Sequence, residues 1–327
     1  MLDSLRYYSR RGAAHLLQSK RFVGNPLFRR VVEGRMRRKI SRVAAGLPPR
    51  QLTLENTSIC NAKCVMCPYP VMERAKANMD GDLYLKGLRD AQELGIKWIQ
   101  PQFFGEPLVD KNLGDKIRNA KELGLYVTLF SNGSLLDKAK AEMLVESGVD
   151  EVKISIDSCK PEVYEAIRKG LRFQKVLDNV RGLMETKRRL GRDKPRVWVM
   201  FVEFEANHTE TREFYDFWSK IVDKVNISRS HNWGGRVEVK GLTILQEQKY
   251  RFPCPSPWDQ LVVNAQGEIL PCCCDYEGNS LSLGNLRDMT LREAWQGEKM
   301  EHIRRKHLER KFDDLPLCGT CRPNDIW

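Results

Sequence analysis

The sequence predicts a parallel α/β fold followed by a smaller, cysteine-rich part. Between residues 51 and 227, six short apolar strands alternate with helical patterns, which is the rhythm of a parallel sheet covered by helices. After about residue 236 this rhythm stops, and Cys, Pro, Gly and Trp become frequent around one helical stretch at 291–309. Nine of the ten cysteines fall in two groups, which in a chain of this size favours metal ligands over disulfides.

The expected elements follow one another without an internal repeat. Strands are predicted at 52–56, 98–103, 126–130, 151–156, 197–201 and 225–227. Helices are predicted at 83–94, 113–123, 139–147, 161–167 and 173–190. Their spacing fits either an open sheet or a partial barrel, and in both folds functional groups gather at the carboxyl ends of the strands.

Charge separates a third region from these two. Residues 1–50 contain thirteen Lys and Arg against two acidic residues, so nearly all of the net charge of +12 lies there. We therefore divide the chain into a basic amphipathic helical extension at 1–48, a barrel at 49–236 and a cysteine-rich domain at 237–327. The extension could dock on an anionic membrane or an acidic partner, or simply pack along the barrel. The nearly neutral remainder argues against a nucleic-acid binder.

Targeting signals are not apparent in the sequence. No apolar run approaches the ~18 residues of a membrane span, and the arginine-containing N-terminus lacks the apolar core of a signal peptide. We expect a cytoplasmic protein, with peripheral attachment to the membrane as a further option.

The first cysteine group follows the first strand with the spacing C-x3-C-x2-C, at Cys60, Cys64 and Cys67. Three thiolates in one loop can hold three irons of a [4Fe–4S] cluster and leave the fourth iron open to another ligand. A structural zinc site would need a fourth ligand nearby, and none follows within the loop.

This motif resembles the signature of the radical S-adenosylmethionine (SAM) superfamily. The resemblance implies a partial (β/α)6 TIM-type barrel, a [4Fe–4S] cluster that binds SAM, and an external reductant such as flavodoxin or ferredoxin. It also implies reductive cleavage of SAM to a 5′-deoxyadenosyl radical that abstracts hydrogen from a substrate. Met66, before the last cysteine, occupies the position that packs near the adenine of SAM.

Further positions resemble the SAM contacts of this family. They are Gly105, Glu106, Ser131, Asn132, Ser155, Asp157 and Arg168. By this resemblance, Glu106 would bind the SAM amino group, and Gly105 would allow close approach of the backbone. The segment 155–157 would contact the ribose and carboxylate, and Arg168 the carboxylate. The family's preceding glycine is Phe104 here, so this motif is a variant.

The second cysteine group lies near the C-terminus. It comprises Cys254, Cys272, Cys273, Cys274, Cys318 and Cys321. A strand–turn–strand around Gly267 leads into the triplet, and the whole region resembles the SPASM domain, which binds auxiliary [4Fe–4S] clusters. The family's seven-cysteine set for two clusters is absent. We therefore expect one auxiliary [4Fe–4S] cluster on Cys254, Cys272, Cys318 and Cys321, with the choice within the triplet open and a zinc ribbon as the alternative.

Two further residues are candidates for catalysis. Asp275 follows the triplet, where some SPASM enzymes place an acid that deprotonates the substrate; it could equally be structural. Cys159, after the fourth strand, could donate hydrogen in an epimerase or be an inert core thiol. The segment 231–236 could line a substrate pocket or link the two domains.

These predictions favour one function over several others. The leading hypothesis is oxidation of a small or carrier-linked metabolite, with the auxiliary cluster as electron acceptor. The alternatives are modification of a peptide or protein, including cofactor maturation, and radical epimerisation. A zinc-stabilised RNA-binding protein is the non-enzyme alternative.

Overall fold

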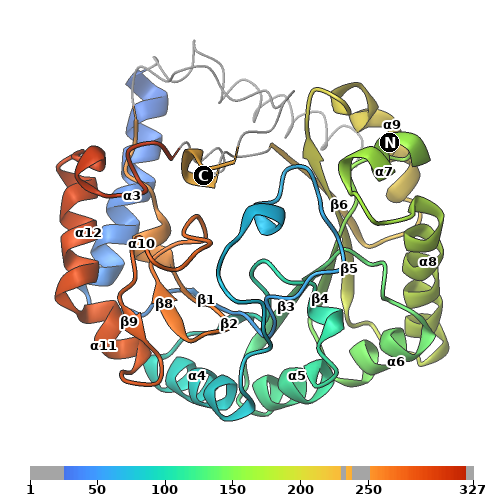
Figure 1. Ribbon diagram of the computed structural model, residues 1–327, viewed down its shortest axis with the longest axis horizontal. Coiled ribbons are helices and arrows are strands. Elements are labelled where there is room, and N and C mark those ends of the chain that lie inside the picture. The colour runs from blue at the N-terminus through green and yellow to red at the C-terminus, as the bar shows by residue number, and fades with distance from the viewer. Residues whose placement is uncertain (1–25, 230–232, 238–250, 322–327) are drawn as a thin grey trace.

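The sheet of the computed structural model runs through both predicted domains. The structure describes residues 26–229, 233–237 and 251–321. Nine strands form one sheet in the order β6-β5-β4-β3-β2-β1-β7-β8-β9. The sheet is curved and does not close, because β6 and β9 are its two edges. The predicted partial barrel is thereby confirmed (Figure 1).

The first six strands are parallel and follow the order of the chain. They are β1 (Gln51–Leu54), β2 (Trp98–Gln100), β3 (Tyr126–Ser131), β4 (Glu151–Ser155), β5 (Arg196–Glu203) and β6 (Lys224–Arg229). The helices between them are α4 (Gly81–Leu94), α5 (Leu113–Glu122), α6 (Lys138–Glu146), α7 (Pro161–Ile167), α8 (Phe173–Arg189) and α9 (Thr211–Trp218). Figure 1 shows α4, α5, α6 and α8 along the outer side of the curved sheet.

The alternation of buried and half-buried side chains along the strands shows which face of the sheet packs against the helices. Val152 and Ile154 of β4 are fully buried, as are Val197 and Val199 of β5, whereas Trp198 between them is only half-buried. Successive side chains of a strand point to opposite faces, so the aliphatic residues pack under the helices and the others face the inside of the barrel. The main core therefore lies between sheet and helices.

The cysteine-rich part continues the barrel sheet, which the sequence did not predict. Its first strand, β7 (Gln260–Val263), pairs in parallel with β1. β8 (Glu268–Leu270) then pairs antiparallel with β7, so the predicted hairpin around Gly267 is confirmed, and β9 (Gly284–Asn285) completes the sheet. The predicted domain boundaries stay predictions.

Two helical predictions need correction. The single helix expected at 291–309 is divided into α11 (Leu291–Gln296) and α12 (Glu298–Leu308), because Gly297 has extended backbone angles (φ −76°, ψ 162°). Helix α9, between β5 and β6, was not predicted. Both errors concern short helices, for which periodicity is a weak signal.

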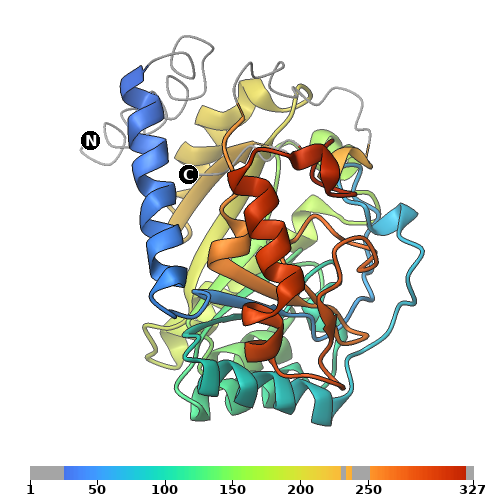
Figure 2. The same ribbon diagram turned by 90° about the vertical axis from the view of Figure 1, so that its left-hand side faces the viewer.

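Helix α3 (Pro26–Ala44) forms part of the predicted basic extension; residues 1–25 lie outside the described residues. Val32 and Met36 are buried, and α3 packs against the short helix α10 (Ser256–Asp259) of the cysteine-rich part (Figure 2). No helix within the described ranges is both long and apolar enough to cross a membrane.

Candidate active site and cluster-binding cysteines

The first cysteine loop is fixed to the segment that follows α7. Two backbone amides next to Cys64 donate hydrogen bonds to the carbonyls of Ile167 and Lys169, at 2.9 and 2.8 Å. Cys60 and Cys67 lie on either side of this attachment and pack against a common aromatic cluster. The three predicted cluster ligands therefore belong to one loop held at the carboxyl end of β1.

Burial sets the electrostatics of these thiols. It raises the pKa of Cys60 and of Cys67 to about 12, and it also raises the pKa of Cys64. Binding to iron requires thiolates, so the positive charge of a cluster would have to displace the three protons. Three sulfur donors from one loop fit a cluster with one open iron.

Glu106 forms the centre of the predicted SAM contacts. Its carboxylate accepts hydrogen bonds from the Ser131 hydroxyl (2.7 Å) and from the Asn132 amide (2.7 Å). Burial raises the pKa of Glu106, although these donors oppose the shift. At Gly105, a Cβ atom would lie 2.0 Å from the carbonyl oxygen of Thr57, so only glycine fits there. The predicted Gly105–Glu106 motif therefore contacts the residues at the end of β3.

The end of β3 also contacts the cysteine loop. The side-chain amide of Asn132 donates to Asn61 Oδ1 (2.9 Å), and Asn61 in turn donates to the hydroxyl of Ser134 (2.9 Å). Asn61 directly follows Cys60, so a continuous set of hydrogen bonds joins the cluster loop to the residues that hold Glu106. A ligand bound to the open iron would lie beside this network.

Arg168 and Asp157 form a buried ion pair next to the same loop. Arg168 Nε lies 2.7 Å from Asp157 Oδ2, and its Nη1 lies 3.8 Å from Cys64 Sγ. Burial acts to lower the pKa of Arg168, but the Asp157 carboxylate outweighs it and the net shift is upward. Asp157 also accepts from the amide of Val202 (2.9 Å). The pair orients Arg168 toward the cluster loop, and the roles of both in SAM binding stay predictions.

Met66 and Ser155 complete the predicted SAM contacts. Met66 is buried, and its carbonyl accepts a hydrogen bond from Trp233 Nε1 (2.7 Å). Ser155 ends β4 and is half-buried on the inner face of the barrel. Both lie where the resemblance expects them along the chain, and their contacts with SAM stay predictions.

The second cysteine group gathers residues from three distant segments. Burial raises the pKa of Cys254 to about 12, and the thiolates of Cys272 and Cys321 add to this shift. The same sulfur atoms act on Cys318, whose pKa is also raised by burial. Cys274 Sγ lies 3.8 Å from Cys321 Sγ. Cys321 therefore lies beside the triplet, and Cys274 is a further candidate ligand from it.

Asp275 is fully buried and stabilises a turn. Its Oδ2 accepts hydrogen bonds from the amides of Ser280 (3.0 Å) and Leu281 (2.8 Å), and its Oδ1 lies 4.0 Å from an Arg236 nitrogen. This geometry favours the structural alternative. The catalytic role of Asp275 stays a prediction.

Cys159 lies between the end of β4 and α9. Burial raises the pKa of its thiol to about 12, with Glu213 and Glu210 adding to the shift. Its neighbours are thus residues of α9 and of the turn before it. Its role as a hydrogen donor stays a prediction.

A buried ion pair that the sequence did not predict joins the two cysteine sites. Glu55, fully buried after β1, accepts from Arg74 (2.7 Å) and from the amides of Phe104 (3.1 Å) and Ala265 (2.8 Å). Arg74 also donates to the carbonyl of Tyr276, at 2.7 Å. The signal available in the sequence was an acidic residue at the end of a buried strand, directly before the cysteine motif.

Aromatic residues form a second connection. The Phe104 ring lies 5.2 Å from the Trp233 ring and 5.9 Å from the Tyr276 ring, so the residue that replaces the family's glycine packs between the two cysteine sites. Trp233 belongs to the segment predicted as a pocket or linker; its first two residues, His231 and Asn232, lie outside the described residues. The Trp233 contacts favour the linker alternative.

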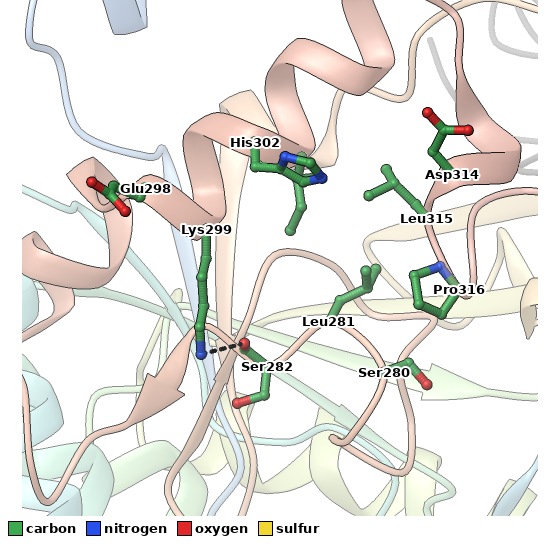
Figure 3. Close-up of a pocket in the computed structure, with 10 residues that line it drawn as sticks. Ser280, Leu281, Ser282, Glu298, Lys299, His302, Asp314, Leu315 and Pro316 are labelled. Atoms are coloured by element: carbon green, nitrogen blue, oxygen red, sulfur yellow. Dashed lines mark hydrogen bonds between the residues drawn. The ribbon is translucent and has the colours of Figure 1, made fainter.

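A pocket of about 400 Å³ lies on the cysteine-rich part, between α12 and the segments 280–282 and 314–316. Figure 3 shows Lys299 and His302 of α12 on one side and Leu281 and Leu315 on the other. None of the predicted site residues lines this pocket, so it is separate from the candidate active site.

Comparisons with protein families match both parts of the chain. Residues 54–191 match the radical SAM superfamily, and residues 254–322 match SPASM, an iron–sulfur cluster-binding domain. A tungsten-containing aldehyde ferredoxin oxidoreductase cofactor-modifying protein from Pyrococcus furiosus is 26% identical over 316 residues, 83% of this chain and 88% of that protein. A PqqA peptide cyclase from Gluconobacter oxydans is 27% identical over 277 residues, 76% of each chain.

Solved structures share the fold. BtrN in complex with AdoMet and 2-DOIA matches with a TM-score of 0.58 at 19% identity, over 85% of this chain and 96% of BtrN. Streptococcus suis SuiB bound to the precursor peptide SuiA matches with a TM-score of 0.65 at 15% identity, over 81% of this chain and 69% of SuiB. At these identities the likeness concerns the fold alone.

Proposed function

Because this chain belongs to the radical SAM superfamily and carries the SPASM iron–sulfur cluster-binding domain, we propose that it modifies a peptide side chain by radical chemistry. Membership in this family implies SAM and [4Fe–4S] clusters as cofactors. We assign the SAM-binding cluster to Cys60, Cys64 and Cys67. We assign one auxiliary cluster to the second cysteine group.

The residues around the first loop would position SAM. When bound, the cluster supplies one electron to SAM, and the resulting 5′-deoxyadenosyl radical takes a hydrogen atom from the substrate. Glu106, held by Ser131 and Asn132, would accept the SAM ammonium, because a buried carboxylate gains a counter-charge in this way. Arg168, oriented by Asp157, would face the SAM carboxylate.

One observation carries the proposal of a second, functional cluster site. Arg74 and Phe104 both contact Tyr276, which lies two residues after the Cys272–Cys274 triplet. A substrate beside SAM would therefore also lie near the auxiliary site. A cluster held there would supply an acceptor for the electron that the substrate radical loses when it is oxidised to product.

The choice of a peptide substrate is supported by the relatives. Among the curated proteins that match over three quarters or more of this chain are PqqA peptide cyclases and a cofactor-modifying protein. This favours peptide or cofactor modification over the metabolite oxidation expected from the sequence.

Oxidation of a small or carrier-linked metabolite is the second candidate. The observation that favours it is the match to 96% of BtrN, whose complex contains 2-DOIA. The peptide-bound SuiB, in contrast, is covered to 69%. An external reductant such as flavodoxin or ferredoxin would serve either reaction.

The test begins with anaerobic reconstitution. About eight irons per chain are expected for two [4Fe–4S] clusters, and SAM with a reductant should release 5′-deoxyadenosine. The matched control replaces Cys60, Cys64 and Cys67 with Ala, which should abolish the release. Zinc in place of iron, without cleavage of SAM, would contradict the enzyme assignment.

The substrate class needs a second experiment. The protein is coexpressed with short peptides encoded next to its own gene, and each peptide is examined by mass spectrometry for the loss of two hydrogens. The same peptides with the triple alanine variant serve as the control. Stimulation of SAM cleavage by a low-mass metabolite fraction, with every peptide unchanged, would replace the peptide proposal by the second candidate.

A further inference from the structure

Helix α3 presents a row of arginines without acidic partners. Arg30, Arg35, Arg37 and Arg38 are exposed, and within the described part of the chain no ion pair joins any of them to a carboxylate. Four guanidinium groups on one short helix create a positive field that extends into solvent and attracts acidic partners. This surface accounts for part of the charge that the sequence concentrates in residues 1–50.

The apolar side of α3 is already used by the protein itself. Val32 and Met36 are buried against the body of the protein, and only single apolar residues such as Val31 remain exposed. A helix that lies in a membrane interface needs an apolar face to insert among the lipids. The described part of α3 has no such face available, so its exposed side fits an acidic protein better than a membrane.

The same helix lies next to the auxiliary cysteine site. Lys39 forms an ion pair with Asp259 of α10, and α10 begins two residues after Cys254. The Cys254 residue reaches the surface in part, whereas its thiol is buried. The arginine surface is thus adjacent to one edge of the auxiliary site.

We propose that α3 is the docking surface for an acidic one-electron carrier protein, which exchanges electrons with the auxiliary cluster near Cys254. One electron leaves the reduced cluster and enters the carrier; in an oxidised flavodoxin it gives the semiquinone, which takes its proton from water. Opposite charges bring the two proteins together on the helix that contacts the segment following Cys254. This inference rests on the proposed function only for the presence of a cluster at Cys254.

The test uses the full chain with reconstituted clusters and an acidic flavodoxin as the probe. The protein is photoreduced and mixed with oxidised flavodoxin, and formation of the semiquinone is followed by stopped flow. Neither SAM nor substrate is present, so failure of the proposed reaction would leave this assay unaffected. Repeating it with Cys60, Cys64 and Cys67 replaced by Ala restricts the signal to the auxiliary cluster.

Two charge-reversal variants are compared. Arg35→Glu/Arg38→Glu changes α3, and Arg181→Glu/Arg188→Glu makes the same change on α8, on the opposite flank of the barrel (Figure 1). The α3 variant should slow the transfer about tenfold or more at low salt, with the difference lost near ~1 M salt. The α8 variant should remain within about twofold of the wild type.

Several results would overturn the proposal. Equal slowing by both variants would indicate a general effect of net charge, and a wild-type rate independent of salt would exclude electrostatic docking. Binding to phosphatidylglycerol vesicles or to DNA that is lost only in the α3 variant, with unchanged electron transfer, would assign the surface to a membrane or a nucleic acid. Iron content and circular dichroism check that each variant is folded.

Discussion

Replacing Arg74 with Met should destabilise the protein strongly. The Arg74 side chain is only 6% exposed, and its partner Glu55 is fully buried at 2.7 Å. The substitution leaves the Glu55 carboxylate with two amide donors but no counter-charge, and it also removes a hydrogen bond to Tyr276. Breaking one side of a buried ion pair costs about 3–5 kcal/mol, a large part of the ~5–15 kcal/mol that stabilises a typical protein.

The assay is urea unfolding of wild type and variants under anaerobic conditions. Arg118→Met is the matched control, because Arg118 pairs with Asp115 on the exposed surface of α5 and should cost less than about 1 kcal/mol. Adding Glu55→Gln to Arg74→Met should recover part of the loss, since the buried charge is then gone. The reasoning is refuted if Arg74→Met costs no more than Arg118→Met, or if the two changes at the buried pair are additive.

Three further predictions concern single positions. Gly105→Ala places a carbon 2.0 Å from the carbonyl oxygen of Thr57, just before the cysteine loop, so release of 5′-deoxyadenosine should fall about tenfold or more, whereas Gly81→Ala, with open space around it, should leave the rate unchanged. Burial lowers the pKa of His307 to about 4, below its ordinary ~6.5. The buried neutral ring therefore contributes its full share to the free energy of unfolding above ~pH 6.5, and this contribution is lost as the pH falls toward 4. Between about pH 7 and 5 the wild type should therefore lose about 2 kcal/mol more than His307→Asn in urea unfolding, and equal losses would contradict this assignment. Cys274→Ser should lower the iron content more than Cys273→Ser, because Cys274 contacts another cysteine of the site; equal iron contents would leave Cys274 outside the ligand set.

Much of the barrel could be predicted because its signals are local. The strands alternate between aliphatic residues that face the helices and other residues that face the barrel, and each strand is followed by its own helical pattern. The pairing of β7 with β1 has no such signal, because these strands are about 200 residues apart and neither sequence contains a pattern that specifies its partner strand. Gly297 was missed for another reason: glycine within a helical pattern is often tolerated, and only its extended backbone shows the break.

The candidate site divides in the same way. Glu106, Ser131 and Asn132 could be predicted as neighbours, because the carboxyl ends of adjacent parallel strands meet at one edge. Arg74 and Trp233 were not predicted as connections between the cysteine sites. Their partners come from segments that are distant in the chain, and a lone Arg or Trp carries no pattern that shows them.

These tertiary connections explain why the two cysteine sites would act as a unit. The parallel pairing of β7 with β1 fixes the distance between the first loop and the auxiliary site through a rigid sheet. Arg74 and Phe104 fill the space between them with buried contacts, so a shift of one loop must strain the other. Under the proposed function, these contacts would hold the second site in one position relative to a substrate radical formed beside SAM. The substitution of Phe for the family's glycine at position 104 is consistent with such a role, because glycine there would leave the aromatic contact unfilled.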